Sequence, residues 1–511
     1  MARRHSPGEG QLVTLASSTG ERASNASHQS STSVVDRLAS DVDGRLVVSW
    51  PGSKSWRTVK RAPRRLQPGW QIGLLVAGAP IWWAAGISDL ALPLLAAPLA
   101  WQLRKRRIRV PPGFWIWLLF LIWVAASVLM MNYPVPDTQS SEGFGRYIAY
   151  GVRFMQYVAV TVILLWVGNT TERELSRARV IRWVGWLALV TIALGAAAVA
   201  FPTFGFPALT SYVLPGFLVQ GDGIAYLAQV QDVLGDASPR PAAPFQYTNE
   251  WGSVLSMSLV WLAVAWGTLG SLGKRVLLGC VLAVAAVPIV YSLNRAMWLG
   301  LLIAVAYVVV RLAMRGRLLA GFLSMFAVTV AAVVFVVSPL GTLVSERFEN
   351  PHSNEVRSAL ADAAVNAAES SPVIGAGSTR NTIGSERSIA IGPGPNCERC
   401  GARVIGSTGQ VWLLLIAQGF VGAGLYIAFL LRVLWAGRSD ASPLGIAATL
   451  VLVMQLLYAF FYGALGMPLT ITMLGVALLW RNAALRADTA LADQSDHDAR
   501  IGPYARAGSR P

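Results

Sequence analysis

The chain has 511 residues, of which 54% are hydrophobic and only 13% are charged, and its mean hydropathy is +0.51. Soluble domains carry about 25% charged residues, and a single soluble core stops growing at about 250–300 residues. The composition therefore excludes a set of soluble domains. It predicts an all-α, polytopic transmembrane helix bundle with about twelve spans of about 20 residues each.

The formal net charge of +16 is high enough for a nucleic-acid-binding protein, but the positions of the basic residues indicate another origin. The four lysines each lie beside an apolar run, and the arginines crowd the same short loops. This asymmetry is typical of the positive-inside rule for membrane proteins. We therefore expect membrane lipids as surroundings and no nucleic acid as a partner.

The two ends of the chain are polar. Residues 1–68 are rich in Ser, Arg and Gly and lack the apolar segment of a signal peptide. We expect a cytoplasmic, largely disordered N-terminal tail there, with a short folded piece around residues 46–56 as the alternative. Residues 69–481 form the expected transmembrane domain, and residues 482–511 a cytoplasmic C-terminal tail.

Apolar runs predict where the chain crosses the membrane. Residues 70–103 are too long for one span and break at 86–89, which predicts a tight helical hairpin. The basic connections between spans place both termini in the cytoplasm of a multi-pass plasma-membrane protein. The ten further expected spans are 113–131, 146–167, 183–201, 251–268, 276–292, 297–314, 318–338, 411–434, 444–461 and 464–480.

Two long connections are expected on the extracytoplasmic side, residues 202–249 and the large loop 338–408. Within the large loop, Asn354 can cap a helix and Pro372 follows its expected end, which predicts a helix over residues 354–370. A structured loop of this size usually carries function. A passive lid is the alternative.

Isolated arginines on the expected outer side need an explanation. Arg146 and Arg153 lie two turns apart on one helix face, and Arg153 is about 10 Å deeper at about 1.5 Å per residue. An ion at that depth needs a wet cavity or a partner, so we expect either a pocket for phosphate or carboxylate, or an ion pair with an acid such as Glu250. Arg240 and Arg295 are further isolated outer cations. Together they suggest one anionic ligand, because the planar fork of arginine suits phosphate oxygens.

Other candidate groups are few. His352 is the one histidine expected outside, available for proton transfer near neutral pH, although a solvated surface residue is the alternative. Cys397 and Cys400 lack the second ligand pair that zinc needs, and we expect a loop-closing disulfide. The sequence has no P-loop, dinucleotide fingerprint or H-E-x-x-H motif, and no paired acidic residues in the outer loops near the first spans. Any catalysis is therefore expected to need no metal and no cofactor.

Five short motifs occur in a fixed order: P-F-Q-Y-T-N (244–249), S-L-N-R-A-M-W-L-G (292–300), E-R-F (346–348), S-P-V-I-G-A-G (371–377) and Q-G-F-V-G (418–422). The ordered set resembles the O-antigen ligase and O-antigen polymerase-like family of bacterial membrane glycosyltransferases, over residues 70–481. One departure is Thr408, which stands where family members usually have a histidine. Threonine cannot act as a base at neutral pH. Either His352 substitutes for the histidine, or catalysis needs no imidazole, or activity is lost or changed.

The resemblance implies transfer or polymerisation of a glycan from a polyprenyl-diphosphate-linked donor onto a glycan or lipid acceptor, at the outer face of the plasma membrane. Cations at the departing diphosphate would then be the main source of catalysis. The diphosphate-binding residues that it implies are Arg146, Arg153, Arg295, Arg240, Arg347 and Arg357. His352 or Glu250 is expected to orient the acceptor.

Two other functions compete with the enzyme. A transporter or flippase of an anionic or lipid-linked saccharide would suit about twelve spans and a basic pocket, but transporters often show two similar halves, and the large loop breaks any such symmetry. The third possibility is a non-catalytic scaffold that binds other polysaccharide-assembly proteins.

Overall fold

The computed structural model describes residues 67–139, 145–213, 240–316, 352–383 and 403–507, together with five short strands elsewhere. The chain divides into two compact units, Met1–Leu66 and Gln67–Pro511. In the first unit, β1 (Ala39–Val42), β2 (Arg45–Val48) and β3 (Arg57–Val59) form an antiparallel sheet in that order. Ala39 lies opposite Val48, and Leu46 lies opposite Val59. This sheet overlaps the short folded piece that the sequence allowed around residues 46–56.

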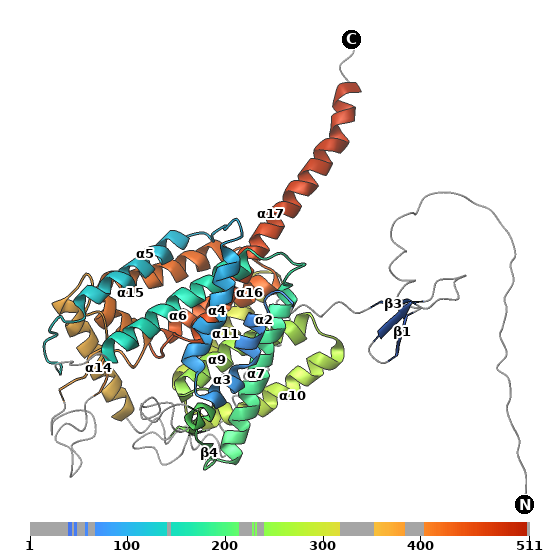
Figure 1. Cartoon of the computed structure of the whole chain (residues 1–511). Helices are drawn as coiled ribbons and strands as arrows, with labels where there is room; N and C mark the ends of the chain where they lie inside the picture. The colour runs from blue at the N-terminus through green and yellow to red at the C-terminus, as the bar shows by residue number, and fades with distance from the viewer. Residues whose placement is uncertain are drawn as a thin grey trace, which may run out of the picture. The chain divides into compact units, whose positions relative to one another are not determined.

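The second unit is a helix bundle (Figure 1). Its helices are α2 (Trp70–Ala77), α3 (Ala79–Ala85), α4 (Ser88–Leu103), α5 (Phe114–Ala126), α6 (Gly145–Gly168), α7 (Arg177–Ala200), α9 (Thr248–Leu262), α10 (Leu272–Tyr291), α11 (Arg295–Ala313), α14 (His352–Ser370), α15 (Gln410–Gly437), α16 (Pro443–Tyr458) and α17 (Met467–Ala507). Short helical segments continue α5 (η1, Ser127–Met130) and α9 (η3, Ala263–Thr268), and η2 covers Leu209–Tyr212. Two antiparallel strand pairs join β4 (Gly205–Phe206) to β5 (Leu227–Ala228) and β6 (Val230–Gln231) to β7 (Arg240–Pro241).

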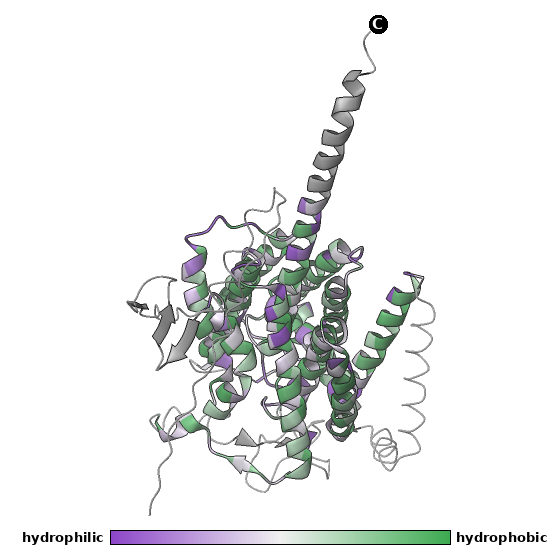
Figure 2. Ribbon diagram, turned by 90° about the vertical axis from the view of Figure 1, so that its right-hand side faces the viewer, coloured by the Kyte–Doolittle hydropathy of each residue, from purple (hydrophilic) through white to green (hydrophobic). Residues whose placement is uncertain are grey.

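Seven helices in the described part are long and apolar enough to cross a membrane: α6, α7, α9 with η3, α10, α11, α15 and the first part of α17. Figure 2 shows hydrophobic residues along the bundle helices and many of the hydrophilic residues near helix ends and in connections. The core lies around α9, α15 and α17. In the apolar stretch of these three helices, 72%, 67% and 78% of the residues are buried, whereas in α10 and α11 only 17% are buried. The expectation of a mostly helical, multi-pass membrane protein is confirmed.

Individual spans agree with the sequence to different degrees. The chain breaks between α3 and α4 at Gly86, where the hairpin was expected, and α14 contains the expected loop helix. Span 318–338 lies outside the described residues, so the count of about twelve stays a prediction. α17 does not end near residue 480 but continues to Ala507, through most of the expected C-terminal tail.

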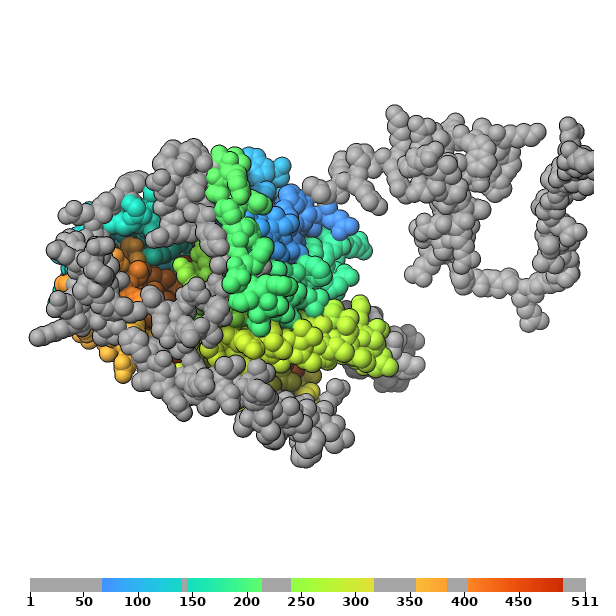
Figure 3. Space-filling model, turned by 90° about the horizontal axis from the view of Figure 1, so that it is seen from below, coloured from blue at the N-terminus to red at the C-terminus, as the bar shows by residue number. Residues whose placement is uncertain are grey.

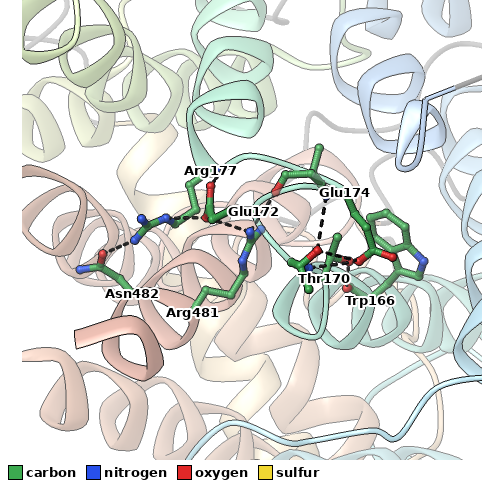
Figure 4. Close-up of polar contacts among 9 residues, drawn as sticks. Trp166, Thr170, Glu172, Glu174, Arg177, Arg481 and Asn482 are labelled. Carbon is green, nitrogen blue, oxygen red and sulfur yellow. Dashed lines mark hydrogen bonds and ion pairs between the residues drawn. The ribbon is translucent and has the colours of Figure 1, made fainter. Parts of the chain in front are cut away.

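Ion pairs hold the connections together at one end of the bundle. Between α6 and α7, Glu172 pairs with Arg177 at 2.7 Å and with Arg481 of α17 at 2.8 Å (Figure 4). Arg106, after α4, pairs with Glu174 at 2.7 Å, and its hydrogen bonds lower the pKa of that carboxyl group. The stabilisation from this pair is therefore present at neutral pH and is lost as the pH falls through the lowered pKa. All of these residues belong to connections expected in the cytoplasm.

At the other end, α15 is broken within its length at Gly419, which has a non-helical φ of 66° and ψ of −172°. The turn formed by residues 371–377 fills the break. The Ala376 N–H donates to the Ile416 carbonyl at 2.8 Å, and the Phe420 N–H donates to the Pro372 carbonyl at 2.9 Å. Two of the sequence motifs, S-P-V-I-G-A-G and Q-G-F-V-G, are thus in direct contact.

Only glycine fits where these two backbones meet. A Cβ atom on Gly419 would lie 2.6 Å from the Pro372 carbonyl oxygen, and one on Gly375 would lie 2.5 Å from the Gly419 nitrogen. The Trp123 indole N–H bridges the turn and the broken helix, because it donates to the carbonyls of Val373 at 3.0 Å and Gln418 at 3.2 Å. The position of the turn is therefore fixed from both sides.

Gly419→Ala is expected to destabilise the protein, because a residue with a side chain adopts this combination of positive φ and extended ψ only at a cost of about 1–3 kcal/mol. The added methyl group also collides with a backbone carbonyl. Gly424→Ala is the matched control in the same helix, since no described atom lies within 4 Å of its added Cβ. Alanine there should be neutral or stabilise by up to about 1 kcal/mol. Thermal unfolding of the detergent-purified proteins compares them, and equal stability of the two variants would show that the break is not required.

Candidate functional site

Three of the predicted arginines line one cavity of about 190 Å³, which we call the arginine cavity, at the end of the bundle opposite the ion pairs. Arg240 lies in β7, Arg295 is the first residue of α11, and Arg357 is near the start of α14. Phe461 and Tyr462, from the connection between α16 and α17, complete the aromatic part of the wall. Segments that are far apart in the sequence therefore bring their cations together.

The turn before α11 determines where Arg295 lies. Leu293 has a positive φ of 49°, and Asn294 caps α11 by accepting from the Met297 N–H at 3.4 Å. The Asn294 amide also donates to the Thr248 carbonyl at 3.3 Å and accepts a hydrogen bond from the Tyr462 hydroxyl. The motifs at 244–249 and 292–300 thus meet at Asn294, in the wall of the arginine cavity.

The composition of this cavity favours an anion. Its guanidinium groups stand beside Asn249, Asn294 and apolar side chains such as Leu299. Like charges repel more strongly where apolar walls lower the effective dielectric, so a bound dianion would relieve the repulsion. Arg357 also donates to the Phe461 carbonyl at 3.3 Å, which helps to orient its planar fork.

Arg146 and Arg153 form a separate group. Neither of them is among the residues that line the arginine cavity. Arg153 donates to the hydroxyls of Ser378 and Thr379, each at 3.3 Å, and Arg146 donates to the Asn132 side chain. Among the described residues no salt bridge joins Arg153 to Glu250 or to another carboxylate, so its contacts are those with the two hydroxyl groups. The described structure therefore divides the predicted arginines into two groups.

Arg380 belongs to the second group and was missed in the sequence. It is buried and donates to the backbone carbonyls of Met131 at 2.9 Å and Ala376 at 3.1 Å. Its pKa is lowered, first by burial and then by the positive charge of Arg146. It follows the S-P-V-I-G-A-G motif by three residues, and this position on the expected outer side was the one signal that could have identified it.

Glu250 lies in a different cavity of about 40 Å³, which it shares with Asp89. Each of these acids stands in the first turn of its helix, α9 and α4. Gln156 donates to the Asp89 carboxylate at 3.2 Å. Because Asn249 lines the arginine cavity and Glu250 lines this one, the start of α9 separates the two cavities. Asp89 was not among the predicted site residues.

Gln410 joins α6 to the connection between α16 and α17. Its side-chain amide donates to the Tyr157 hydroxyl at 2.7 Å and accepts from the Ala464 N–H at 2.9 Å. Its backbone N–H donates to the Tyr462 carbonyl at 2.8 Å.

Figure 3 shows this end of the molecule from below, with residues of α6 (teal), of α9 to α11 (yellow-green) and after residue 403 (orange) visible beside the grey atoms.

The remaining predicted residues are only partly visible in the structure. His352 begins α14, but its side chain lies outside the described part, as do Arg347, Cys397 and Cys400. The Thr408 hydroxyl is buried and has no hydrogen-bond partner among the described residues. Within the same residues, no group of three or more His, Cys, Asp or Glu side chains is placed to hold a metal ion.

A family model of O-antigen ligase matches residues 278–396, which include most of α10, the whole of α11 and α14, and both Arg295 and Arg357. The matched stretch, about a quarter of the chain, is similar to O-antigen ligases. The match confirms the resemblance drawn from the ordered motifs. It supports a membrane glycosyltransferase of the O-antigen ligase or polymerase type, with a place in polysaccharide biosynthesis. A search of curated proteins gave no match.

Arg153→Ala is expected to leave the folded yield close to that of the unmodified protein. The change removes two long hydrogen bonds, at 3.3 Å each, to hydroxyl groups, and it leaves no described carboxylate without its partner. Loss of a buried ion-pair partner would instead cost about 3–5 kcal/mol. Membrane blots of Arg153→Ala beside the double variant Arg153→Ala/Glu250→Gln decide the matter. Depletion of the single variant that the double variant rescues would restore the ion-pair alternative.

Proposed function

We propose that this O-antigen ligase-like protein transfers or polymerises a glycan from a polyprenyl-diphosphate-linked donor at the outer face of the plasma membrane. The observation that carries the proposal is the convergence of Arg240, Arg295 and Arg357 on one cavity. Two of these residues lie within the region that matches the O-antigen ligase family. The planar fork of arginine fits phosphate oxygens bidentately, so the cavity suits the donor's diphosphate.

In the proposed reaction, the acceptor hydroxyl oxygen forms a bond to the anomeric carbon of the donor sugar. The bond from that carbon to the diphosphate oxygen breaks, and its electron pair leaves with the lipid diphosphate. Guanidinium groups already placed at that oxygen stabilise the developing charge. They supply the positive charge that a metal ion would otherwise provide, so the proposed reaction uses neither a metal nor a cofactor.

Glu250 is the group that we assign to the acceptor. It shares its cavity with Asp89, next to the arginine cavity. A carboxylate there can accept a hydrogen bond from the acceptor hydroxyl and take its proton as the new bond forms. His352 is the alternative for this role. Arg146 and Arg153 remain proposed diphosphate ligands, and their position outside the arginine cavity implies smaller effects when they are replaced.

Arg295→Gln and Arg357→Gln are each expected to lower the transfer rate by about 10²–10³-fold, as for loss of one preorganised donor at a developing oxyanion. Lysine at either position keeps the charge but not the fork, so its loss should be intermediate. Arg275→Gln, an exposed arginine at the opposite end, is the matched control and should leave transfer unchanged. The assay is turnover of a lipid-diphosphate sugar by purified protein in vesicles. Unchanged transfer in both cavity variants would overturn the proposal, as would movement of the lipid across the bilayer without transfer.

The proposed orientation places both termini in the cytoplasm and the arginine cavity outside. Single cysteines at Ser388 and Ala483, in a chain whose three native cysteines are replaced by serine, should react with a membrane-impermeant thiol reagent from opposite sides. Ser388→Cys should be labelled in intact cells, and Ala483→Cys only after the membrane is opened. Labelling of both from the same side would contradict this orientation.

A further inference from the structure

The end of the bundle that holds the ion pairs also contains a large cavity of about 940 Å³. It lies between the segment after α4, the connection from α6 to α7, and α17. α6 has 24 residues and separates this cavity from Arg146 by about 35 Å, at about 1.5 Å per residue. The cavity therefore takes no part in the glycan-transfer site.

Four arginines line the cavity: Arg107, Arg109, Arg173 and Arg481. The lining acids are Glu172, which is already shared between Arg177 and Arg481, and Asp488. Among the residues that the structure describes, no ion pair joins Arg107, Arg109 or Arg173 to a carboxylate. The cavity therefore carries an excess of positive charge.

Arg481 gives a second, independent indication of a ligand. Its side chain is only 5% exposed, and one of its terminal nitrogens donates to Glu172 at 2.8 Å and to the Leu175 carbonyl at 2.9 Å. The other terminal nitrogen, Nη1, is buried and has no acceptor within the described part of the chain. A buried donor without an acceptor is costly, and an anionic oxygen seated in the cavity would supply one.

The segment that carries two of these arginines is held in place. The Arg109 N–H donates to the Asn169 side chain at 2.8 Å, and the Asn169 amide donates to the Arg109 carbonyl at 2.9 Å. These paired hydrogen bonds fix the chain after α4 against the end of α6. Arg107 and Arg109 are thereby presented to the cavity from a fixed backbone, which lowers the entropic cost of binding.

The wall also has an apolar part, formed by Val110, Trp480 and Leu485. Val110 is 52% exposed and Leu485 is 38% exposed. Basic pockets between membrane helices on the cytoplasmic side suit anionic headgroups, and exposed apolar side chains beside them suit the start of an acyl chain. We propose that this cavity binds a phosphate group, and that an anionic phospholipid headgroup brings it.

The test uses full-length purified protein in detergent, titrated with phosphatidylglycerol, phosphatidylcholine or inorganic phosphate. Bound lipid is counted by native mass spectrometry, and the unfolding temperature is followed in parallel. The cavity variant is Arg107→Ala/Arg109→Ala/Arg173→Ala. The matched control is Lys274→Ala/Arg275→Ala/Arg315→Ala, which removes three exposed cations that do not line the cavity. Arg481 is left intact because Glu172 depends on it.

Phosphatidylglycerol is expected to bind and stabilise the unmodified protein and the control, with phosphatidylcholine much weaker. The cavity variant should bind phosphatidylglycerol roughly 100-fold more weakly, because each basic side chain near an anionic lipid contributes about a fivefold gain. Protection by inorganic phosphate that the cavity variant abolishes would support the phosphate site with a soluble ligand in place of lipid. Equal losses in both triple variants, or no preference for the anionic lipid, would overturn the proposal.

Discussion

The break in α15 at Gly419 is the constraint on which the outer end of the molecule depends. A helix interrupted within a membrane domain exposes backbone groups that cost several kcal/mol each if they stay unsatisfied. The turn at 371–377 supplies their partners, so it must lie against the break. That contact fixes the end of α14 and the segment after the turn. Ser378 and Thr379 consequently reach Arg153 on α6.

The hydrogen bonds of Gln410 link this broken helix to both cavities. Gln410 is the first residue of α15, more than two turns before the break, and it binds both the Tyr157 hydroxyl and the backbone of the α16–α17 connection. That connection contributes Tyr462 to the arginine cavity and Gly466 to the cavity of Glu250. One amide side chain thus couples the helix of Arg153 to the walls of both cavities, and the proposed donor and acceptor sites share a single support.

The sequence predicted what depends on local pattern. Apolar runs located the helices, the capping residue and proline located α14, and the scarcity of outer cations identified Arg240 and Arg295. It could not predict which arginines share a cavity, because that depends on contacts between segments that are far apart in the sequence. Asp89 was overlooked for the same reason, since only the folded chain places Asp89 of α4 and Glu250 of α9 in the wall of one cavity. The sequence did not predict that α17 continues past residue 480, because the apolar pattern ends there while the helix goes on through polar residues.

The two ends of the bundle use arginine in different ways. At the basic end, Arg106, Arg177, Arg481 and Arg486 each pair with a carboxylate, which neutralises much of their charge and joins the connections. At the other end, Arg153 is held by hydroxyls and Arg380 by backbone carbonyls. Neutral acceptors orient a guanidinium group but leave its net charge intact. An end built in this way keeps a positive field for an incoming anion while its side chains stay ordered. That is the preorganisation that the proposed departure of a lipid diphosphate would require.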